Sequence, residues 1–519
     1  MNRNTLLNSL LEHDDQQWDV IVIGGGATGL GIALDAVTRG FRTILLEQSD
    51  FSKGTSSRST KLVHGGVRYL AQGDILLVRE ALHERGLMLV NAPHLTTNQE
   101  FVIPAYTWWD CFLYTVGLKF YDLLAGSLSM GRSYFISASR VRTRLPLINP
   151  NRLKGGIVYH DGQFDDSRMA IALADAFVSR GGIALNYFRV TGLLKNEKKR
   201  IDGVKALDSG TGAEHIIRGR LVINATGVFA DEIHRMDDPH SKPTIRPSQG
   251  VHIVLDGDFL QSSSAIMIPK TDDGRVLFAI PWFGKVVTGT TDTPLEKISE
   301  EPRALDYEID FILKTAGRYL TRPPGRADIL CIYAGLRPLA ADPENPKSTK
   351  EISRRHKITI SDSGLLSIVG GKWTSYRRMA EETLDRGIKA GLLPSRRCLT
   401  RNLKLYDNNQ VLRQERLRIY GNRANEIEKL IVQNPGLGEK IVPGLPYTRA
   451  EIIWICRNEM PFTLEDMLAR RTRALVLDAR ASIKMAPETA RLMADELGFD
   501  ITWQDEQIKA YNRFIMSYL

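Results

Sequence analysis

Cysteine is scarce in this chain of 519 residues. The four cysteines, Cys111, Cys331, Cys398 and Cys456, lie far apart and form no CxxC pair or other metal-ligand spacing. This distribution argues against a disulfide framework and against a cysteine-based metal site. Free thiols are typical of a reducing compartment, so we expect a protein on the cytoplasmic side that binds no metal.

Long apolar stretches are also missing. No run of about 18 uncharged apolar residues is present, the length that a helix needs to cross a bilayer. Residues 1–17 are polar and acidic, which argues against a secretory signal and a transit peptide and predicts a short helix around Leu6 to Leu11. Internal repeats and low-complexity tracts are absent too, so no repeat architecture is expected.

What remains is the composition of a soluble multidomain protein. With 43% hydrophobic and 25% charged residues, a chain of this length should divide into two or three domains. The net charge of +9 suits an anionic substrate, an anionic membrane surface or a nucleic acid. Nucleic acid is disfavoured because paired basic residues such as Arg377-Arg378 and Arg396-Arg397 have no interleaved aromatic side chains.

A βαβ unit near the N-terminus predicts dinucleotide binding. Gly24, Gly26 and Gly29 form a GxGxxG turn, and Glu47 follows about 20 residues later, where it can accept from ribose hydroxyls. The glycines allow a tight turn, close approach to a pyrophosphate and helix–strand packing. The flanking elements are a buried strand at 20–23, a helix at 30–38 and a second buried strand at 43–46.

Later segments favour FAD over a nicotinamide cofactor. The stretch 220–227, RLVINATG, predicts a buried strand that ends in small residues. The stretch 365–376, LLSIVGGKWTSY, predicts a strand that leads through two glycines into a helix, whose N-terminus can point at the flavin or ribityl chain. A fold that returns to its dinucleotide three times suits a flavin, because a simple nicotinamide enzyme has no use for the third segment.

The remaining segments predict a second sheet and a helical end. Strands are expected at 155–159, 251–255, 265–269, 276–280 and 286–290, with turn residues between several of them. After about residue 400 the pattern becomes helical, as in 412–433 and 464–484.

The segment from Trp108 to Met130 allows two interpretations. Its apolar residues follow helical spacing, but Tyr114, Leu118 and Tyr121 make the opposite side apolar as well. It is either a buried core helix or a helix in a membrane interface, with Trp and Tyr at headgroup depth and Lys119 reaching to water.

Six motifs stand together in this chain, in the order VIGGGATGLGIALDA, GTSSRSTKLVHGGVRYL, INATGVFAD, GTTDTP, AGLRPL and GGKWTSYRRMAE. Their order and spacing resemble the FAD-dependent glycerol-3-phosphate dehydrogenase family over about residues 18 to 500. The resemblance implies an α/β fold with a Rossmann-like FAD-binding domain of the glutathione-reductase and amino-acid-oxidase type, a β-rich substrate domain and an all-helical C-terminal domain. The expected domains are 18–95, 181–245 and 346–395 for FAD, 96–180 and 246–345 for substrate, and 400–519 for the helices.

The resemblance also implies a reaction. The enzyme would remove hydride from C2 of sn-glycerol 3-phosphate to flavin N5, give dihydroxyacetone phosphate and pass electrons to a membrane quinone. It would lie peripherally on the inner face of the cytoplasmic membrane, and a homodimer is compatible with this. Two alternatives stay open: an oxygen-reducing glycerol-3-phosphate oxidase, whose added segment is not seen here, and an amine or amino-acid oxidase, which would not need three cations.

The substrate phosphate requires converging cations and the alcohol requires a base. Arg68, Arg337 and Lys372 are the expected phosphate ligands and come from three separate segments. His64, in the stretch TKLVHGGVRY, is the first choice of base and His252 the second, and positive neighbours should keep either imidazole neutral. By family position, the FAD-binding residues are Gly24, Gly26, Gly29, Glu47, Thr55, Ser56, Lys61, His64, Gly65, Val190, Ala225, Gly227, Lys372 and Thr374.

Overall fold

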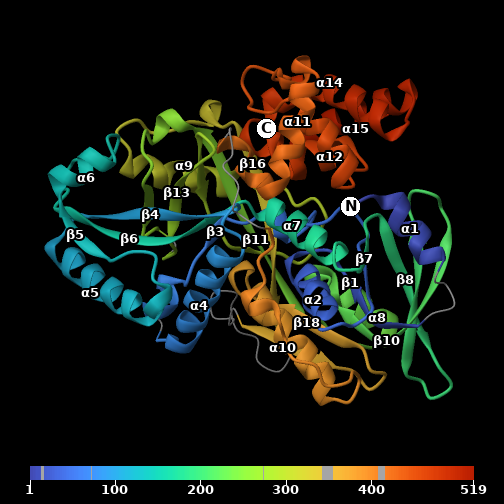
Figure 1. Ribbon diagram of the computed structural model, residues 1–519. Helices are drawn as coiled ribbons and strands as arrows, with labels where there is room; N and C mark the ends of the chain where they lie inside the picture. The colour runs from blue at the N-terminus through green and yellow to red at the C-terminus, as the bar shows by residue number, and fades with distance from the viewer. Residues whose placement is uncertain (13–16, 72, 273, 342–354, 407–414) are drawn as a thin grey trace.

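The structure, a computed structural model, describes residues 1–12, 17–71, 73–272, 274–341, 355–406 and 415–519. Two sheets lie side by side, and the C-terminal helices sit above their junction in the view of Figure 1. The short N-terminal helix α1 (Arg3–Leu11) covers one end of the first sheet, with Leu6 and Leu10 buried. This arrangement agrees with the α/β fold class expected from the sequence.

The first sheet holds the expected βαβ unit. β1 (Trp18–Ile23) and β2 (Thr43–Leu46) are parallel, and α2 (Ala27–Thr38) connects them. The strand order is β17 (His356–Ile360), β18 (Leu366–Gly370), β10 (Glu214–Asn224), β1, β2 and β7 (Ile183–Leu185), while β8 (Phe188–Lys195) and β9 (Ile201–Asp208) extend β10 as an antiparallel ribbon. Strands β18, β10, β1, β2 and β7 run parallel, so their carboxyl ends meet at one edge.

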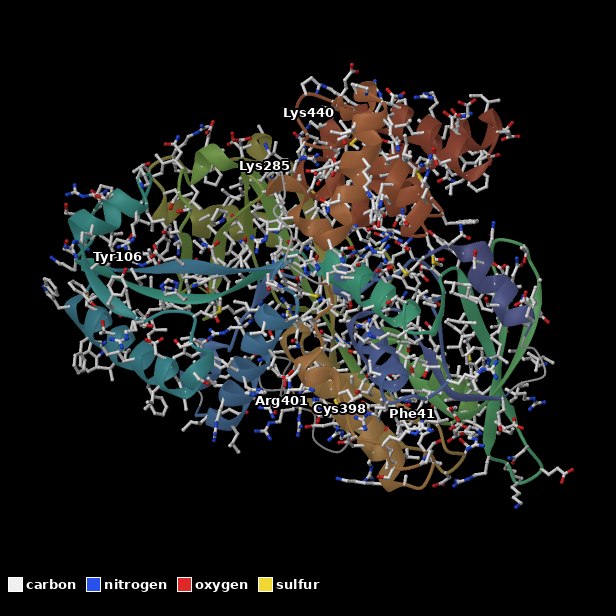
Figure 2. The ribbon with its side chains drawn as sticks, viewed as in Figure 1. Phe41, Tyr106, Lys285, Cys398, Arg401 and Lys440 are labelled. Atoms are coloured by element: carbon white, nitrogen blue, oxygen red, sulfur yellow. The ribbon has the colours of Figure 1, made fainter. Side chains whose placement is uncertain are left out.

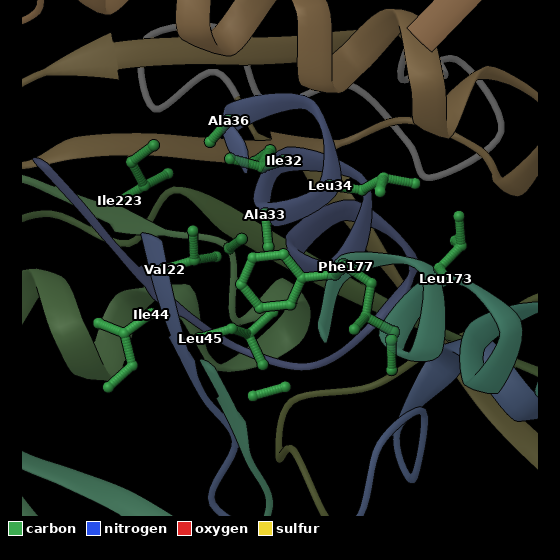
Figure 3. Packing of buried hydrophobic residues seen from close by; sticks show 14 of the residues in the cluster. Val22, Ile32, Ala33, Leu34, Ala36, Ile44, Leu45, Leu173, Phe177 and Ile223 are labelled. Atoms are coloured by element: carbon green, nitrogen blue, oxygen red, sulfur yellow. The ribbon is translucent and has the colours of Figure 1, made fainter. Parts of the chain in front are cut away.

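Helix α7 (Asp166–Val178) corrects one expected domain boundary. The sequence placed residues 96–180 in the substrate domain, but α7 packs on α2. Figure 3 shows Leu173 and Phe177 of α7 among residues of α2 and β2. The physical reason is the crossover: α7 leads into β7, which pairs parallel with β2, so the helix must cover the first sheet. Helix α10 (Tyr376–Lys389) also packs on α2, and α8 (Ala230–Asp237) follows β10.

The second sheet is mostly antiparallel and contains the five predicted strands. Its order is β15 (Thr293–Pro294), β11 (Ile245–Asp256), β14 (Lys285–Gly289), β13 (Leu277–Trp282), β12 (Ala265–Ile268), β4 (Thr96–Ala105), β6 (Gly155–Phe164) and β3 (Leu62–Val63), with β16 (Cys331–Ala340) on β11 and β5 (Tyr134–Ser137) on β6.

Successive side chains of the second sheet point alternately into two hydrophobic clusters, one on each face. On β4, Val102 joins the cluster that contains residues of α6 (Ala138–Arg144) and α9 (Asp306–Tyr319). Its neighbours Phe101 and Ile103 join the cluster with α4 (Ile75–Asn91) and α5 (Trp108–Ala125). The sheet is therefore covered by helices on both faces. The short α3 (Val67–Ala71) precedes α4.

The C-terminal domain is helical, as expected. It consists of α11 (Ala424–Gln433), α12 (Arg449–Asn458), α13 (Ala474–Leu477), α14 (Ala479–Leu497) and α15 (Ile501–Ile515). Its core also takes in Trp282 and Tyr333 of the second sheet, so the domain is anchored there. Of the predicted helical stretch 412–433, residues 412–414 lie outside the described part.

Helix α5 is a surface helix, so the core-helix interpretation is wrong. Only Cys111, Leu118 and Tyr121 are buried on it. Trp109 is 67% exposed and Leu123 is 73% exposed. None of the described helices combines the length and apolar character needed to cross a membrane.

The four cysteines are free thiols, as predicted. Cys111, Cys331 and Cys456 are buried. Cys398 is partly exposed, and its label stands between those of Arg401 and Phe41 in the lower part of the molecule in Figure 2.

Candidate active site

A cavity of about 450 Å³ is lined by residues of both sheets. Its first wall is the carboxyl edge of the parallel strands: the turns after β1, β2 and β10 and the segment after β18. Its second wall comes from β11, β16 and the segment that follows β14. A mostly apolar group closes the remaining side: Phe101, Tyr159, Met267, Val276 and Phe278. Crevices at the carboxyl ends of parallel strands are where α/β sheets bind their ligands.

The glycine turn after β1 has no room for side chains. Gly24 has a φ of +109°, and a Cβ there would lie 2.7 Å from the carbonyl oxygen of Ala225. A Cβ on Gly29 would lie 1.9 Å from the Gly24 carbonyl oxygen. Gly24 and Gly26 line the cavity, whereas Gly29 packs the helix against the turn. Bare backbone at the start of α2 is a cradle for a pyrophosphate.

Substituting Gly24 with alanine should therefore weaken FAD binding. The positive φ and the contact with Ala225 impose a strain of about 1–3 kcal/mol, which corresponds to roughly a fivefold to hundredfold increase in Kd. The measurement is fluorescence titration of deflavinated protein with FAD. Gly117→Ala is the matched control, since a Cβ at Gly117 meets nothing within 4 Å. Equal affinity in both variants would contradict the cradle.

Glu47 lies at the end of β2, where the sequence placed it. Its carboxylate accepts from the backbone N–H of Gly25 at 2.5 Å and of Ser49 at 2.9 Å. Burial raises the pKa of Glu47 to about 6, although these two bonds oppose the shift. Glu47 lines the cavity beside the glycine turn, as a ribose ligand must.

Other predicted FAD ligands also line this wall. Ser56 Oγ accepts from Ala27 N–H at 2.9 Å, and Thr55 Oγ1 donates to the Leu336 carbonyl at 2.5 Å. These bonds tie the 55–56 segment to α2 and to β16. Val190, Ala225, Gly227 and Thr374 line the cavity as well.

Only some residues of the stretch TKLVHGGVRY line the cavity. His64 and Gly66 line it, but Lys61 and Gly65 do not. Lys61 is fully buried and its Nζ donates to Asp166 Oδ2 at 2.7 Å, so the expectation that this side chain faces the cofactor is wrong. The cause is the left-handed backbone at Lys61, with φ of 62°, which turns the side chain toward α7.

Gly65 contacts helix α5 instead of the cavity. Its N–H donates to Tyr121 Oη at 2.9 Å, and a Cβ there would clash with Leu82 and Tyr121. The Tyr121 hydroxyl in turn donates to Asp161, which does line the cavity. Arg68 lies on α3, and its side chain is outside the described part of the structure.

His64 and Lys372 come together across the cavity wall. Burial and the charges of Lys372 and Arg85 lower the pKa of His64 to about 3. Lys372 Nζ lies 3.9 Å from the centre of the Tyr69 ring, a cation–π contact. Thr374 Oγ1 donates to the His64 carbonyl at 3.4 Å. The GGKW segment and the HGG segment thus form one corner, although about 300 residues separate them.

His252 stands on β11 at the cavity with its ring held on two sides. Its Nε2 lies 2.9 Å from Thr60 Oγ1, and its ring stacks on Tyr333 with centroids 4.9 Å apart. Burial, followed by the charges of Arg337 and Lys61, holds the pKa of His252 well below 6.5. The imidazole is therefore neutral at physiological pH.

Arg337, on β16, presents a fixed guanidinium to the cavity. Its Nη1 donates to the Gln249 carbonyl at 3.1 Å, and its Nη2 donates to Thr290 Oγ1 at 3.0 Å and the Thr291 carbonyl at 2.9 Å. Asp292 Oδ1 lies 3.5 Å from Arg337 Nη1 and also accepts from Ser248 Oγ. These contacts hold the guanidinium in one orientation, as recognition of a planar or tetrahedral anion requires.

Sequence reasoning missed several residues that line the cavity, among them Thr60, Tyr69 and Arg275. Thr60 and Tyr69 lie inside the quoted stretch, so their motif was the available signal. Arg275, which precedes β13, adds a cation to the wall and carried no signal beyond its place after a turn.

The residues of this cavity fit FAD. The glycine turn leaves a cradle that any Cβ would fill, Glu47 stands at the ribose position, and the Gly370-Gly371 turn opens a further close approach, since both glycines have positive φ. Trp373 Nε1 donates to the Ser56 carbonyl at 2.8 Å and joins the two ends of the cradle.

Comparison with known proteins agrees with this assignment. Residues 19–377 match the FAD dependent oxidoreductase family, and residues 365–507 match the family of the C-terminal domain of alpha-glycerophosphate oxidase. The mitochondrial glycerol-3-phosphate dehydrogenase of Homo sapiens is 40% identical over 534 residues, covering 96% of this chain and 73% of that protein. The mitochondrial glycerol-3-phosphate dehydrogenase SDP6 of Arabidopsis thaliana is 38% identical over 544 residues, covering 96% and 86%.

Solved structures show the same likeness. The glycerol-3-phosphate dehydrogenase from Bacillus halodurans complexed with FAD has a TM-score of 0.80 and 29% identity, and the match covers 99% of this chain and 97% of that one. The L-alpha-glycerophosphate oxidase from Mycoplasma pneumoniae, with a TM-score of 0.58 and 16% identity over 76% of this chain and 100% of that one, shares the fold.

Proposed function

This chain belongs to the FAD-dependent glycerol-3-phosphate dehydrogenase family, and from that premise we propose that it oxidises sn-glycerol 3-phosphate to dihydroxyacetone phosphate. The observation that carries the proposal is a single cavity in which a dinucleotide cradle meets Arg337, Lys372 and two neutral histidines. Bound FAD supplies the acceptor for the hydride that leaves C2 of the alcohol.

Arg337 and Lys372 bind the substrate's phosphate in this proposal. The phosphate carries nearly two negative charges, and the guanidinium, whose Nη–H groups bond to oxygens of the protein, attracts it as a fixed positive charge. Arg337 is held by four groups, so little side-chain entropy is lost when the phosphate binds. Lys372 adds a point charge from the other side of the cavity.

His252 takes the hydroxyl proton. It must be neutral to do so, and burial together with Arg337 keeps it neutral. The arriving phosphate offsets the charge of Arg337, which raises the basicity of the imidazole when the substrate is present. We place the proton on His252 and not on His64, because His252 is the histidine whose pKa responds to Arg337, whereas that of His64 responds to Lys372 and Arg85.

Substrate turnover tests this function directly. Glycerol 3-phosphate should be oxidised with a dye acceptor, while glycine and sarcosine should give no turnover. An amine or amino-acid oxidase would give the reverse result, and inactivity on the phosphate ester would overturn the proposal. Oxygen uptake much slower than dye reduction would distinguish the dehydrogenase from an oxidase.

We further propose that the electrons pass to a quinone in a membrane on whose inner, cytoplasmic face the protein lies. The support is the outer face of α5, which exposes a continuous row of large apolar side chains: Trp108, Trp109, Phe112, Leu113, Val116, Phe120 and Leu123. Such a face suits the headgroup boundary of a bilayer. The inner face of α5 reaches the cavity wall through the bond from Tyr121 to Asp161, so the bilayer would lie close to the flavin.

Sedimentation with lipid vesicles tests this attachment. In Phe112→Asp/Val116→Asp, the fraction bound to phosphatidylglycerol-containing vesicles should fall at least about tenfold, because two carboxylates would enter the interface. Turnover with a water-soluble dye should persist. Val432→Asp is the control, since Val432 is also an exposed apolar residue but lies on α11 of the C-terminal domain. Unchanged vesicle binding in the double variant would contradict the proposal.

A further inference from the structure

A buried ion network joins the C-terminal domain to the segment that runs past His252. Arg473 lies just before α13 and is 2% exposed. Its Nη2 donates to the Ser57 carbonyl at 3.0 Å and to Asp166 Oδ1 at 3.1 Å. One side chain of the helical domain therefore contacts both the 57–61 segment and the start of α7.

Asp166 extends this network along the segment. Its Oδ2 accepts from Lys61 Nζ at 2.7 Å, from Ser59 Oγ at 2.7 Å and from Ser59 N–H at 3.0 Å. Lys61 Nζ also donates to the Ser57 carbonyl at 2.8 Å. Against the effect of burial, Lys61 and Arg473 lower the pKa of Asp166, so the carboxylate stays charged. Ser57, Ser59 and Lys61 are thus anchored to one carboxylate and one guanidinium.

Thr60 lies between two anchored residues and lines the cavity. Its hydroxyl is 2.9 Å from His252 Nε2. The Tyr333 hydroxyl donates to the Ser59 carbonyl at 3.0 Å, and the Tyr333 ring stacks on His252 at an interplanar angle of 13°. Both groups that fix the imidazole are therefore attached to the anchored segment.

A contribution to folding stability does not by itself explain why this ion network is present. Burying Arg473, Lys61 and Asp166 costs desolvation that their attraction only offsets, and apolar residues of the same size often do as well. The network also holds Lys61 in a left-handed conformation that a non-glycine residue avoids. What the ion network supplies, and an apolar cluster would not, is a fixed orientation of hydrogen-bonding groups.

We propose that Arg473 of the C-terminal domain is a positioning residue for the oxidation: through Asp166 and Ser59 it holds Thr60 where the threonine hydroxyl orients His252. This inference rests on the function proposed above. It gives the helical domain a part in the chemistry, although Arg473 does not line the cavity.

A double-mutant cycle tests the proposal in the full-length, FAD-loaded protein. Arg473→Met and Thr60→Val should each lower kcat for glycerol 3-phosphate about tenfold with KM within about twofold, since binding is intact and only orientation is lost. In the Thr60→Val background, Arg473→Met should cause no further loss, because both act on the same bond. Independent, multiplied losses would overturn the proposal. Thr60→Ser keeps a hydroxyl and should recover part of the turnover lost in Thr60→Val.

Arg471→Met is the matched control. Arg471 is equally buried in the same domain, but its guanidinium ends on Asp50 and the Glu459 carbonyl. The Arg471→Met variant should have a lower melting temperature but an unchanged kcat per bound FAD. If Arg473→Met does not fold, Ser59→Ala removes one bond to Asp166 and should lower kcat in the same direction. Full kcat in Ser59→Ala would then refute the positioning role.

A readout without turnover separates this inference from the proposed function. In protein labelled with ¹⁵N-histidine, the ring resonances of His252 should shift in Arg473→Met and Thr60→Val and stay unchanged in Arg471→Met. His252→Asn assigns these resonances. If the wild type does not oxidise glycerol 3-phosphate, the proposed function is refuted, but this comparison still shows whether Arg473 positions His252. Unshifted His252 resonances in a folded Arg473→Met protein would overturn it.

Discussion

Replacing Arg337 with alanine should lower kcat/KM for glycerol 3-phosphate by about 10²–10³-fold while FAD stays bound. The variant loses a fixed positive charge beside the phosphate, worth about 3–4 kcal/mol in a desolvated site, and tenfold in affinity corresponds to about 1.4 kcal/mol. It also leaves Asp292, which is buried, without the nearby guanidinium. Steady-state kinetics, with the FAD content measured by absorbance, provide the test.

Two further variants make the Arg337 experiment specific. Arg337→Lys keeps the charge but loses the planar fork, so its kcat/KM should lie between those of the wild type and the alanine variant. Arg326→Ala removes an exposed arginine that pairs with Asp306 and Asp310, and its kinetics should match the wild type. Wild-type kcat/KM in Arg337→Ala would show that the phosphate binds elsewhere.

Replacing His252 with alanine should slow flavin reduction in a single turnover by about 10²–10⁴-fold, the usual contribution of a general base. KM should change little, because phosphate binding by Arg337 and Lys372 is retained. Stopped-flow absorbance measures the reduction step apart from reoxidation. His64→Ala should slow it less, since His64 forms the cavity corner with Lys372 but is not the proton acceptor in this account.

His94 supplies a matched control for this experiment. Burial, followed by the charges of Arg168 and Arg418, lowers the pKa of His94 to about 3, as for His64, but His94 does not line the cavity. His94→Leu should leave the reduction rate per FAD unchanged. A rate in His252→Ala equal to that of the wild type, with a large loss in His64→Ala, would exchange the two roles.

The sequence predicted the parts of the fold that rest on local patterns. The unit from β1 to Glu47 follows from hydrophobic runs and glycine spacing, both of which act within about 30 residues. The five strands of the second sheet could be found for the same reason. The boundary at residue 180 was wrong because the docking of α7 depends on the pairing of β7 with β2, a contact across the whole crossover.

The site was less predictable because its contacts span the chain. Lys61 was expected at the cofactor, but its partner Asp166 is 105 residues away and their neighbour Arg473 belongs to another domain. The bond between Thr60 and His252 joins residues 192 apart. Helix α5 was ambiguous for a different reason: both of its faces are apolar, so periodicity alone could not decide which face is buried.

The most direct test of the account is anaerobic reduction of the bound flavin by substrate. Purified FAD-loaded protein is mixed with sn-glycerol 3-phosphate without oxygen or any other acceptor, and the visible absorbance of the oxidised flavin is followed. We predict that the band bleaches and that one dihydroxyacetone phosphate forms for each FAD reduced. A band that stays unchanged with glycerol 3-phosphate, yet bleaches with dithionite, would contradict the account.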